Sequence, residues 1–163
     1  GSPIFRESTG MESLTASISR FRALETNGTF ALAKDIMRLI ADRIDVGPLQ
    51  KLAPPPKNEK WGSLKSLENY LGTLVRAEEA RRVMGPLFGL YQMRLADAHI
   101  SSKDLSDAFG LAGVDPQASV IDQGFDLIDN AARAIWEIGH IVDAHVESKS
   151  AQRQTEDTIK KGE

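Results

Sequence analysis

The sequence contains no cysteine, which excludes disulfides, thiolate metal ligands and cysteine nucleophiles. It also contains no apolar run long enough to cross a bilayer and no signal-peptide pattern at its start. The 20 Lys and Arg residues are outnumbered by 23 Asp and Glu residues, so the chain lacks the basic field of a general nucleic-acid binder. These absences fit a reducing compartment. We expect a cytoplasmic protein that makes no membrane contact and only local contacts with any RNA.

The chain has enough apolar residues for a packed core. Hydrophobic residues make up 41% of it and charged residues 26%, a balance that favours a folded domain over disorder. Gly1-Ser2 looks like a remnant of cloning, so we expect a fragment of a larger protein that has other domains. The length of 163 residues suits one domain. We expect a leader over 1–10, a helical-bundle domain over 11–148, and a polar tail over 149–163 that frays or is disordered.

Two stretches near the N-terminus have the apolar spacing of amphipathic helices. The first covers residues 8–24, and its stripe consists of Met11, Leu14, Ile18 and Phe21. Residues 26–29 read as a turn, after which Thr29 is a candidate cap for a second helix over 30–44. The proline-rich stretch 53–62 that follows is polar and suits neither a helix nor a central strand.

The helical spacing resumes at Ser63 and continues as far as His99. Gly85-Pro86 interrupts it, because proline removes an amide donor and clashes with the preceding turn. We therefore expect two helices or one bent helix here, with the second part over residues 86–99.

The last part of the sequence predicts a short helix and a long one. Residues 101–104 form a capping pattern, and the short helix should end near Gly110 or Gly113. Asp115 is the expected cap of the last and longest helix, with Pro116 at its first position. The apolar stripe of that helix consists of Ile121, Phe125, Ile128, Ala132, Ile135, Gly139, Val142 and Val146. No stretch has a convincing strand alternation, so the fold class is all-α, an up-and-down helical bundle of four to five main helices with a long C-terminal helix.

The stretch LYQMRLADAHI, residues 90–100, places an arginine among apolar residues. On a wheel that advances about 100° per residue, Arg94 lies within about 20° of Leu87, in the middle of the apolar stripe. That stripe also contains Val83, Tyr91 and Ala98. A guanidinium on this side must be paired, reach an opening or face an interface. Asp97 is one candidate partner and another carboxylate is the alternative.

His99 follows Arg94 by five positions and lies about 120° round the wheel, so the two side chains do not converge on one ideal helix. They can meet if the helix ends at His99, or across a twofold axis that brings two copies of the motif to one cleft. A helix C-terminus also favours a cation, which gives His99 a purely structural reason to stand there. The residues alone leave both interpretations open.

The motif RLADAH, an arginine, four residues and a histidine near a helix end, resembles the signature of the HEPN superfamily (higher eukaryotes and prokaryotes nucleotide-binding domain). In that family the pattern often reads Arg-Asn-x-x-Ala-His, so Arg94, Ala98 and His99 match, whereas Leu95 stands where the family usually has a polar residue. The resemblance implies a helical bundle that dimerises with the two motifs facing each other. Many members with this pattern are metal-independent ribonucleases of toxin or defence systems, and others are non-catalytic.

Under this resemblance the candidate catalytic residues are Arg94, His99 and Asp97. Cleavage of RNA through its own 2′-OH needs proton transfer at that hydroxyl and at the leaving oxygen, and a cation near the phosphate. His99 would transfer protons near neutral pH, and Arg94 would bind the phosphate and stabilise the developing charge. Asp97 would orient them. We therefore expect a homodimer that acts on RNA without a metal or cofactor.

Leu95 and the acidic net charge favour a second hypothesis, in which a non-catalytic domain dimerises or docks a protein partner. A third hypothesis is a regulatory bundle that binds a small ligand between its helices. The pair Glu137-x-x-His140 is the unit used in di-iron bundles, which need two such units and two further glutamates. The sequence has no second unit, so we expect no metal site there.

Overall fold

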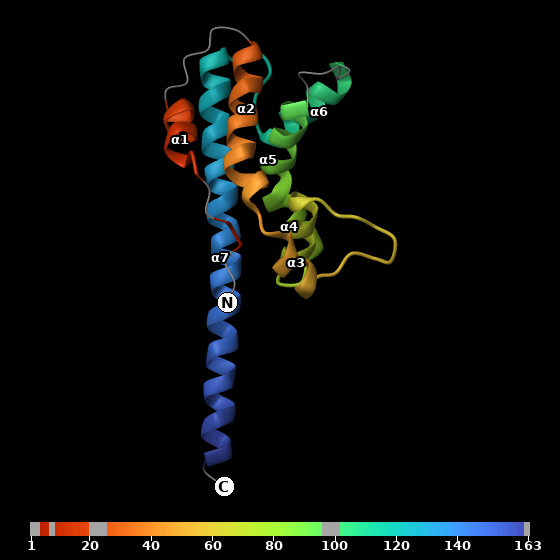
Figure 1. Cartoon of the computed structure of the whole chain (residues 1–163), viewed down its shortest axis with the longest axis vertical. Coiled ribbons are helices and arrows are strands. Elements are labelled where there is room, and N and C mark those ends of the chain that lie inside the picture. The colour runs from red at the N-terminus through yellow and green to blue at the C-terminus, as the bar shows by residue number, and fades with distance from the viewer. Residues whose placement is uncertain (1–3, 7–8, 20–25, 96–101, 162–163) are drawn as a thin grey trace.

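The computed structural model describes residues 4–6, 9–19, 26–95 and 102–161 (Figure 1). This part of the chain forms helices and no strand, apart from an isolated bridge between Phe5 and Ile44. The helices are α1 (Met11–Ser19), α2 (Thr26–Ile40), the 3-10 turn η1 (Ala41–Arg43), α3 (Val46–Leu52), α4 (Ser63–Leu71), α5 (Ala77–Leu95), α6 (Ser102–Ala112) and α7 (Val120–Lys161). The predicted all-α bundle with a long C-terminal helix is confirmed.

Helix α5 is at the centre of the bundle and packs against α2, α4, α6 and α7. In Figure 1, α2 and α7 lie side by side with α1 on their outer side, and α7 extends far beyond the other helices. The largest fully buried apolar side chains come from the four helices α2, α4, α5 and α7: Met37, Leu67, Leu71, Met84, Leu87, Leu90, Met93 and Leu127.

Helix α2 begins earlier than the sequence indicates. Residues 26–29, predicted as a turn, form its first turn, so the role of Thr29 as a cap is wrong. Thr29 is instead fully buried, and its hydroxyl donates a hydrogen bond to Oε1 of Gln123 on α7 over 3.4 Å. This partner stands 94 residues away in the sequence, which is why local capping rules do not find it.

Of the two alternatives expected at Gly85-Pro86, a break between two helices is wrong. α5 continues through Pro86, and the break lies at residues 72–76. There the amide and the hydroxyl of Thr73 both donate to the carbonyl of Tyr70, which replaces the helical hydrogen bonds. Gly85 has no Cβ to clash with the proline ring that follows it, and the buried residues on both sides hold the two halves of α5 in the core.

The connection from α6 to α7 agrees with the sequence at one end and differs at the other. α6 ends just before Gly113, one of the two positions predicted. Gly113 is in the left-handed region at φ 71°, and the amide of Val114 donates to the carbonyl of Phe109. The predicted cap Asp115 is wrong, because Ser119 caps α7. The hydroxyl of Ser119 accepts from the amide of Asp122 and donates to its carboxylate.

The apolar stripe predicted for the last helix is not its buried face. Phe125 is 63% exposed, and Ile121 and Val146 are exposed as well. The buried face lies about 100° round the helix from that stripe. It consists of Leu127, Ala131, Ala134 and Ile138. α7 therefore has two apolar faces, and the small alanines of the buried one let it pack closely against α2 and α5.

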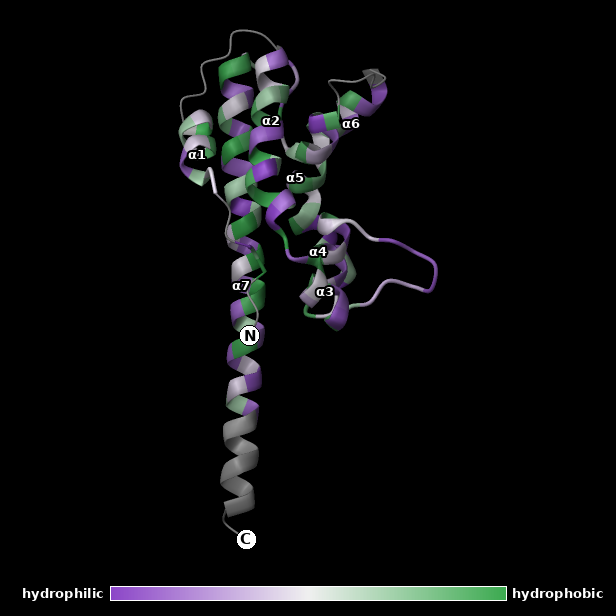
Figure 2. Cartoon of the chain, in the orientation of Figure 1, coloured by the Kyte–Doolittle hydropathy of each residue, from purple (hydrophilic) through white to green (hydrophobic). Residues whose placement is uncertain are grey.

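Helix α7 continues as far as Lys161, so the segment expected as a polar tail, 149–163, belongs to this helix over most of its length. Figure 2 shows hydrophobic residues on α7 well beyond the level at which α2 ends. None of the described helices combines the length and the apolar character that a membrane span requires.

Candidate functional site

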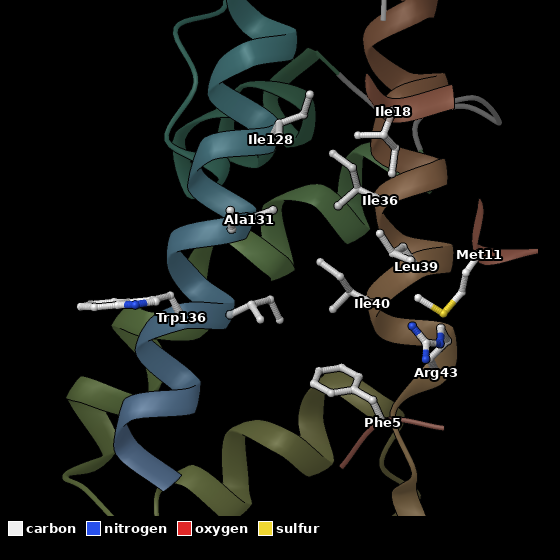
Figure 3. Close-up of a pocket in the computed structure, with 12 residues that line it drawn as sticks. Phe5, Met11, Ile18, Ile36, Leu39, Ile40, Arg43, Ile128, Ala131 and Trp136 are labelled. Atoms are coloured by element: carbon white, nitrogen blue, oxygen red, sulfur yellow. The ribbon is translucent and has the colours of Figure 1, made fainter. Parts of the chain in front are cut away.

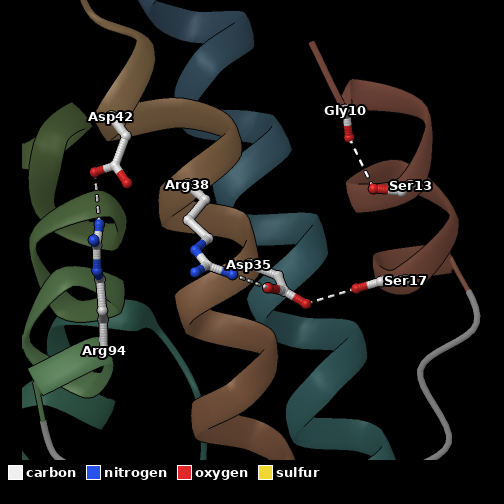
Figure 4. Close-up of polar contacts among 7 residues, drawn as sticks. All are labelled: Gly10, Ser13, Ser17, Asp35, Arg38, Asp42 and Arg94. Atoms are coloured by element: carbon white, nitrogen blue, oxygen red, sulfur yellow. Dashed lines mark hydrogen bonds and ion pairs between the residues drawn. The ribbon is translucent and has the colours of Figure 1, made fainter. Parts of the chain in front are cut away.

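Arg94 lies in the last turn of α5 and makes an ion pair across the bundle (Figure 4). Its Nη1 donates to Oδ1 of Asp42, in the turn η1, over 2.7 Å. The Arg94 side chain is 26% exposed and that of Asp42 is 48% exposed. The guanidinium on the apolar side of α5 is therefore paired with a carboxylate, as the sequence requires, but the partner is Asp42.

The pair leaves Arg94 permanently charged. The hydrogen bond that Arg94 donates to Asp42 raises the pKa of Arg94 and outweighs the opposing effect of partial burial. Because about a quarter of the Arg94 side chain is exposed, the guanidinium lies at an edge of the core and is not enclosed by it. A single carboxylate neutralises it there.

The remaining residues of the motif are only partly placed. Asp97 and His99 lie outside the described residues, so Arg94 is the one predicted site residue whose position the structure describes. Leu95 is exposed. Of the stripe that surrounds Arg94, Val83 and Leu87 are buried, whereas Tyr91 is 40% exposed.

The Glu-x-x-His pair on α7 has partners within the chain. Glu137 accepts a hydrogen bond from Nη2 of Arg82 over 2.7 Å, and His140 meets the ring of Trp136 edge to face. Within the described ranges, no cluster of three or more His, Asp or Glu side chains is placed to hold a metal ion.

An apolar groove of about 600 Å³ lies between α7 on one side and α1 and α2 on the other (Figure 3). Its walls are mainly aliphatic, with Ile36, Leu39 and Ile40 from α2 and Ile128, Ala132 and Ile135 from α7. Arg43 is the only charged side chain that the described residues contribute to the lining. Such a surface binds by hydrophobic burial and offers no acid–base pair for catalysis.

Two polar contacts hold the outer wall of the groove in place. The hydroxyl of Ser17 on α1 donates to Asp35 on α2 over 2.6 Å, beside the Arg38–Asp35 ion pair (Figure 4). The N-terminal segment that carries Phe5 is held by Arg43, whose guanidinium donates to the carbonyl of Arg6.

Family models, curated proteins and solved structures offer no match to this chain.

The sequence reveals some residues of these two features and misses others. Ile128 and Ile135 were identified as members of an apolar stripe, but as core residues and not as a groove wall. Asp42 was not identified at all, because a pair separated by 52 residues leaves no local pattern. The sequence indicates only that Arg94, on the apolar side of its helix, needs a carboxylate partner, and it does not identify which one.

The Arg94–Asp42 pair should contribute little to stability. We expect Arg94→Met and Asp42→Asn each to lower the free energy of unfolding by about 0.5 to 1 kcal/mol, because both side chains are partly exposed. We expect the double variant to lose less than the sum, with a coupling of about 0.5 kcal/mol in urea titrations. A loss above about 2 kcal/mol for Arg94→Met alone would contradict an edge position and indicate a buried charge.

Proposed function

We propose that this domain is a non-catalytic protein-interaction module that receives an amphipathic helix of a partner in the apolar groove. The observation that carries the proposal is the apolar stripe of α7 beside the groove. Phe125, Ala132 and Val146 are exposed, whereas Ile128 and Ile135 line the groove and are only partly buried against the core. Contiguous exposed apolar surface of this kind marks interaction sites in soluble proteins. Helices bind such grooves through apolar residues at positions i, i+3, i+4 and i+7.

The surroundings of Arg94 and the apolar side chain of Leu95 support the same proposal. The charge of Arg94 is already compensated by Asp42, so a phosphate would have to compete with that carboxylate for the guanidinium. Leu95 offers no polar group.

A helical peptide library tests the proposal. Peptides with apolar residues at helical spacing and randomised flanking residues are displayed and selected on the full chain. Enriched peptides are then measured against a groove variant that carries Trp136→Lys, in the groove lining, and Phe125→Lys, on the stripe of α7 beside it. Both side chains are mostly exposed, so the substitutions leave the core intact. The matched control is Leu52→Lys with Leu111→Lys, which adds the same charge at exposed apolar positions outside the groove.

We expect the enriched peptides to bind the control variant as they bind the natural chain, and the groove variant at least tenfold more weakly. Equal binding to both variants, or no enrichment, would overturn the proposal.

A second candidate function is metal-independent RNA cleavage by a homodimer, with Arg94, His99 and Asp97 as the catalytic residues. The observation that favours it is the edge position of Arg94, which leaves part of the side chain open at the end of α5. An incoming phosphate could compete there with Asp42.

Cleavage of a labelled RNA in the presence of EDTA tests this candidate. We expect a ribonuclease to lose at least a hundredfold in rate on His99→Ala and on Arg94→Ala, with the fold retained by circular dichroism. No cleavage by the natural chain, or cleavage that neither substitution slows, would exclude it.

A further inference from the structure

The apolar stripe of α7 is only partly covered by the bundle, through Ile128, Ile135 and Val142, and it has the spacing of a coiled-coil seam. Counting Phe125 as heptad position a, its residues occupy eight successive a and d positions from Ile121 to Val146, all of them apolar or glycine. The next such position is Lys149, which ends the seam. The 26 residues from Ile121 to Val146 span about 38 Å, which is the length a partner helix of similar size would cover.

The two flanks of this seam differ in character. On one flank, the g positions include Ala131 and Ile138, which are buried against the bundle. On the other flank, the e positions are Asp122, Asp129, Trp136 and Asp143, all exposed. In coiled coils, residues at these flanking positions select the partner by charge.

The carboxylates of the exposed flank are only partly compensated. Asp129 pairs with Arg133 over 2.7 Å, and Asp122 accepts from the hydroxyl of Ser119. Asp143 makes no ion pair with any described residue. The flank therefore presents net negative charge beside an apolar seam.

We infer that the groove and seam of α7 accept a basic amphipathic helix from a different polypeptide, whose apolar face covers the a and d positions and whose Lys or Arg side chains face Asp122, Asp129 and Asp143. This inference rests on the proposed function and adds the chemistry of the partner. Trp136 projects from α7 on the side away from α2 (Figure 3) and stands in the same row, where its ring contacts that of His140.

A second copy of this chain fits the surface less well. In an antiparallel pair of α7 helices, e positions face e positions, so the acidic flank would meet itself. In a parallel pair, e faces g, and the g flank is already buried within each copy. The lysines near the end of α7 belong to the same continuous helix and cannot turn back onto the seam.

Three synthetic peptides of about 26 residues serve as probes. The basic peptide has isoleucine and leucine at a and d and lysine at the positions that flank them. The acidic peptide has glutamate in place of each lysine. The scrambled peptide keeps the composition of the basic one without its heptad spacing. Fluorescence anisotropy at low salt reports binding to the full chain. We expect the basic peptide to bind about tenfold more tightly than the acidic one, with a preference that shrinks as salt is raised, and no binding of the scrambled peptide.

Charge reversal on the protein separates this effect from general attraction to an acidic chain. We expect Asp129→Lys with Asp143→Lys to favour the acidic peptide. The matched control, Glu78→Lys with Asp107→Lys, changes the net charge equally on exposed parts of α5 and α6 and should keep the preference for the basic peptide.

The outcomes distinguish the inference from the proposed function. If basic and acidic peptides bind equally well, helix docking stands and the inferred charge selection is wrong. If neither heptad peptide binds, both fail. Sedimentation of the free chain tests whether a second copy occupies the seam. If the chain is a dimer and Phe125→Lys dissociates it, a second copy lies on the seam and the inference is overturned.

Discussion

Gly89→Ala should lower the free energy of unfolding by about 3 kcal/mol and the melting temperature by about 10 °C. Gly89 is buried where α5 meets α6, and a Cβ at this position would lie 2.3 Å from the amide nitrogen of Ala112 and 2.7 Å from the carbonyl oxygen of Ala108. Both atoms belong to the backbone of α6. They cannot rotate away, so the whole helix must shift to make room.

A second glycine of the same pair of helices provides the control. Gly110 lies on the exposed side of α6, and a Cβ there meets nothing within 4 Å. Because alanine is the better helix former, Gly110→Ala should raise the free energy of unfolding by about 0.5 to 1 kcal/mol. Thermal and urea unfolding followed by circular dichroism measure both variants. A Gly89→Ala chain as stable as the natural one would show that α5 and α6 do not pack at this distance.

The elements whose signals are local could be predicted from the sequence. Gly113 ends α6 because only a residue without Cβ adopts its positive φ at little cost. A glycine at this point of the sequence therefore predicts the end of the helix. Pro86 shows the limit of such rules, because a proline inside a helix is decided by the packing of Met84 and Leu87 around it. The start of α7 was misplaced for a related reason, since Asp115 and Ser119 are both competent caps and the fold uses the second.

The sequence also predicts one part of the candidate site and misses another. The helical wheel correctly requires a partner for Arg94, because an unpaired guanidinium among apolar residues is costly. It could not identify Asp42, which the fold brings from the end of another helix. Which face of α7 meets the bundle could not be predicted either. The stripe that begins at Ile121 and the stripe that begins at Leu127 both repeat at alternating steps of three and four residues. The stripe from Ile121 has the larger side chains, although the stripe from Leu127 is the buried one.

Two single substitutions on α7 should decide which of its faces is the core. Leu127 is fully buried, so Leu127→Ala should cost about 3 kcal/mol through lost burial and the cavity that remains. Phe125 stands two residues earlier in the stripe from Ile121 and is 63% exposed, so Phe125→Ala should change the free energy of unfolding by less than about 0.5 kcal/mol, although more side-chain volume is removed. Urea unfolding at low protein concentration measures both.

The test is which of the two substitutions lowers the free energy of unfolding more, because the two possible core faces predict opposite answers. If the stripe from Ile121 to Val146 were the core, Phe125→Ala would be the costly change and Leu127→Ala the mild one. Repeating Phe125→Ala at high protein concentration adds a further check. A cost that grows with concentration would mean that a second copy covers Phe125, because association stabilises the folded chain by mass action. A cost that stays near zero at every concentration leaves the seam uncovered in the free chain and open to a different helix.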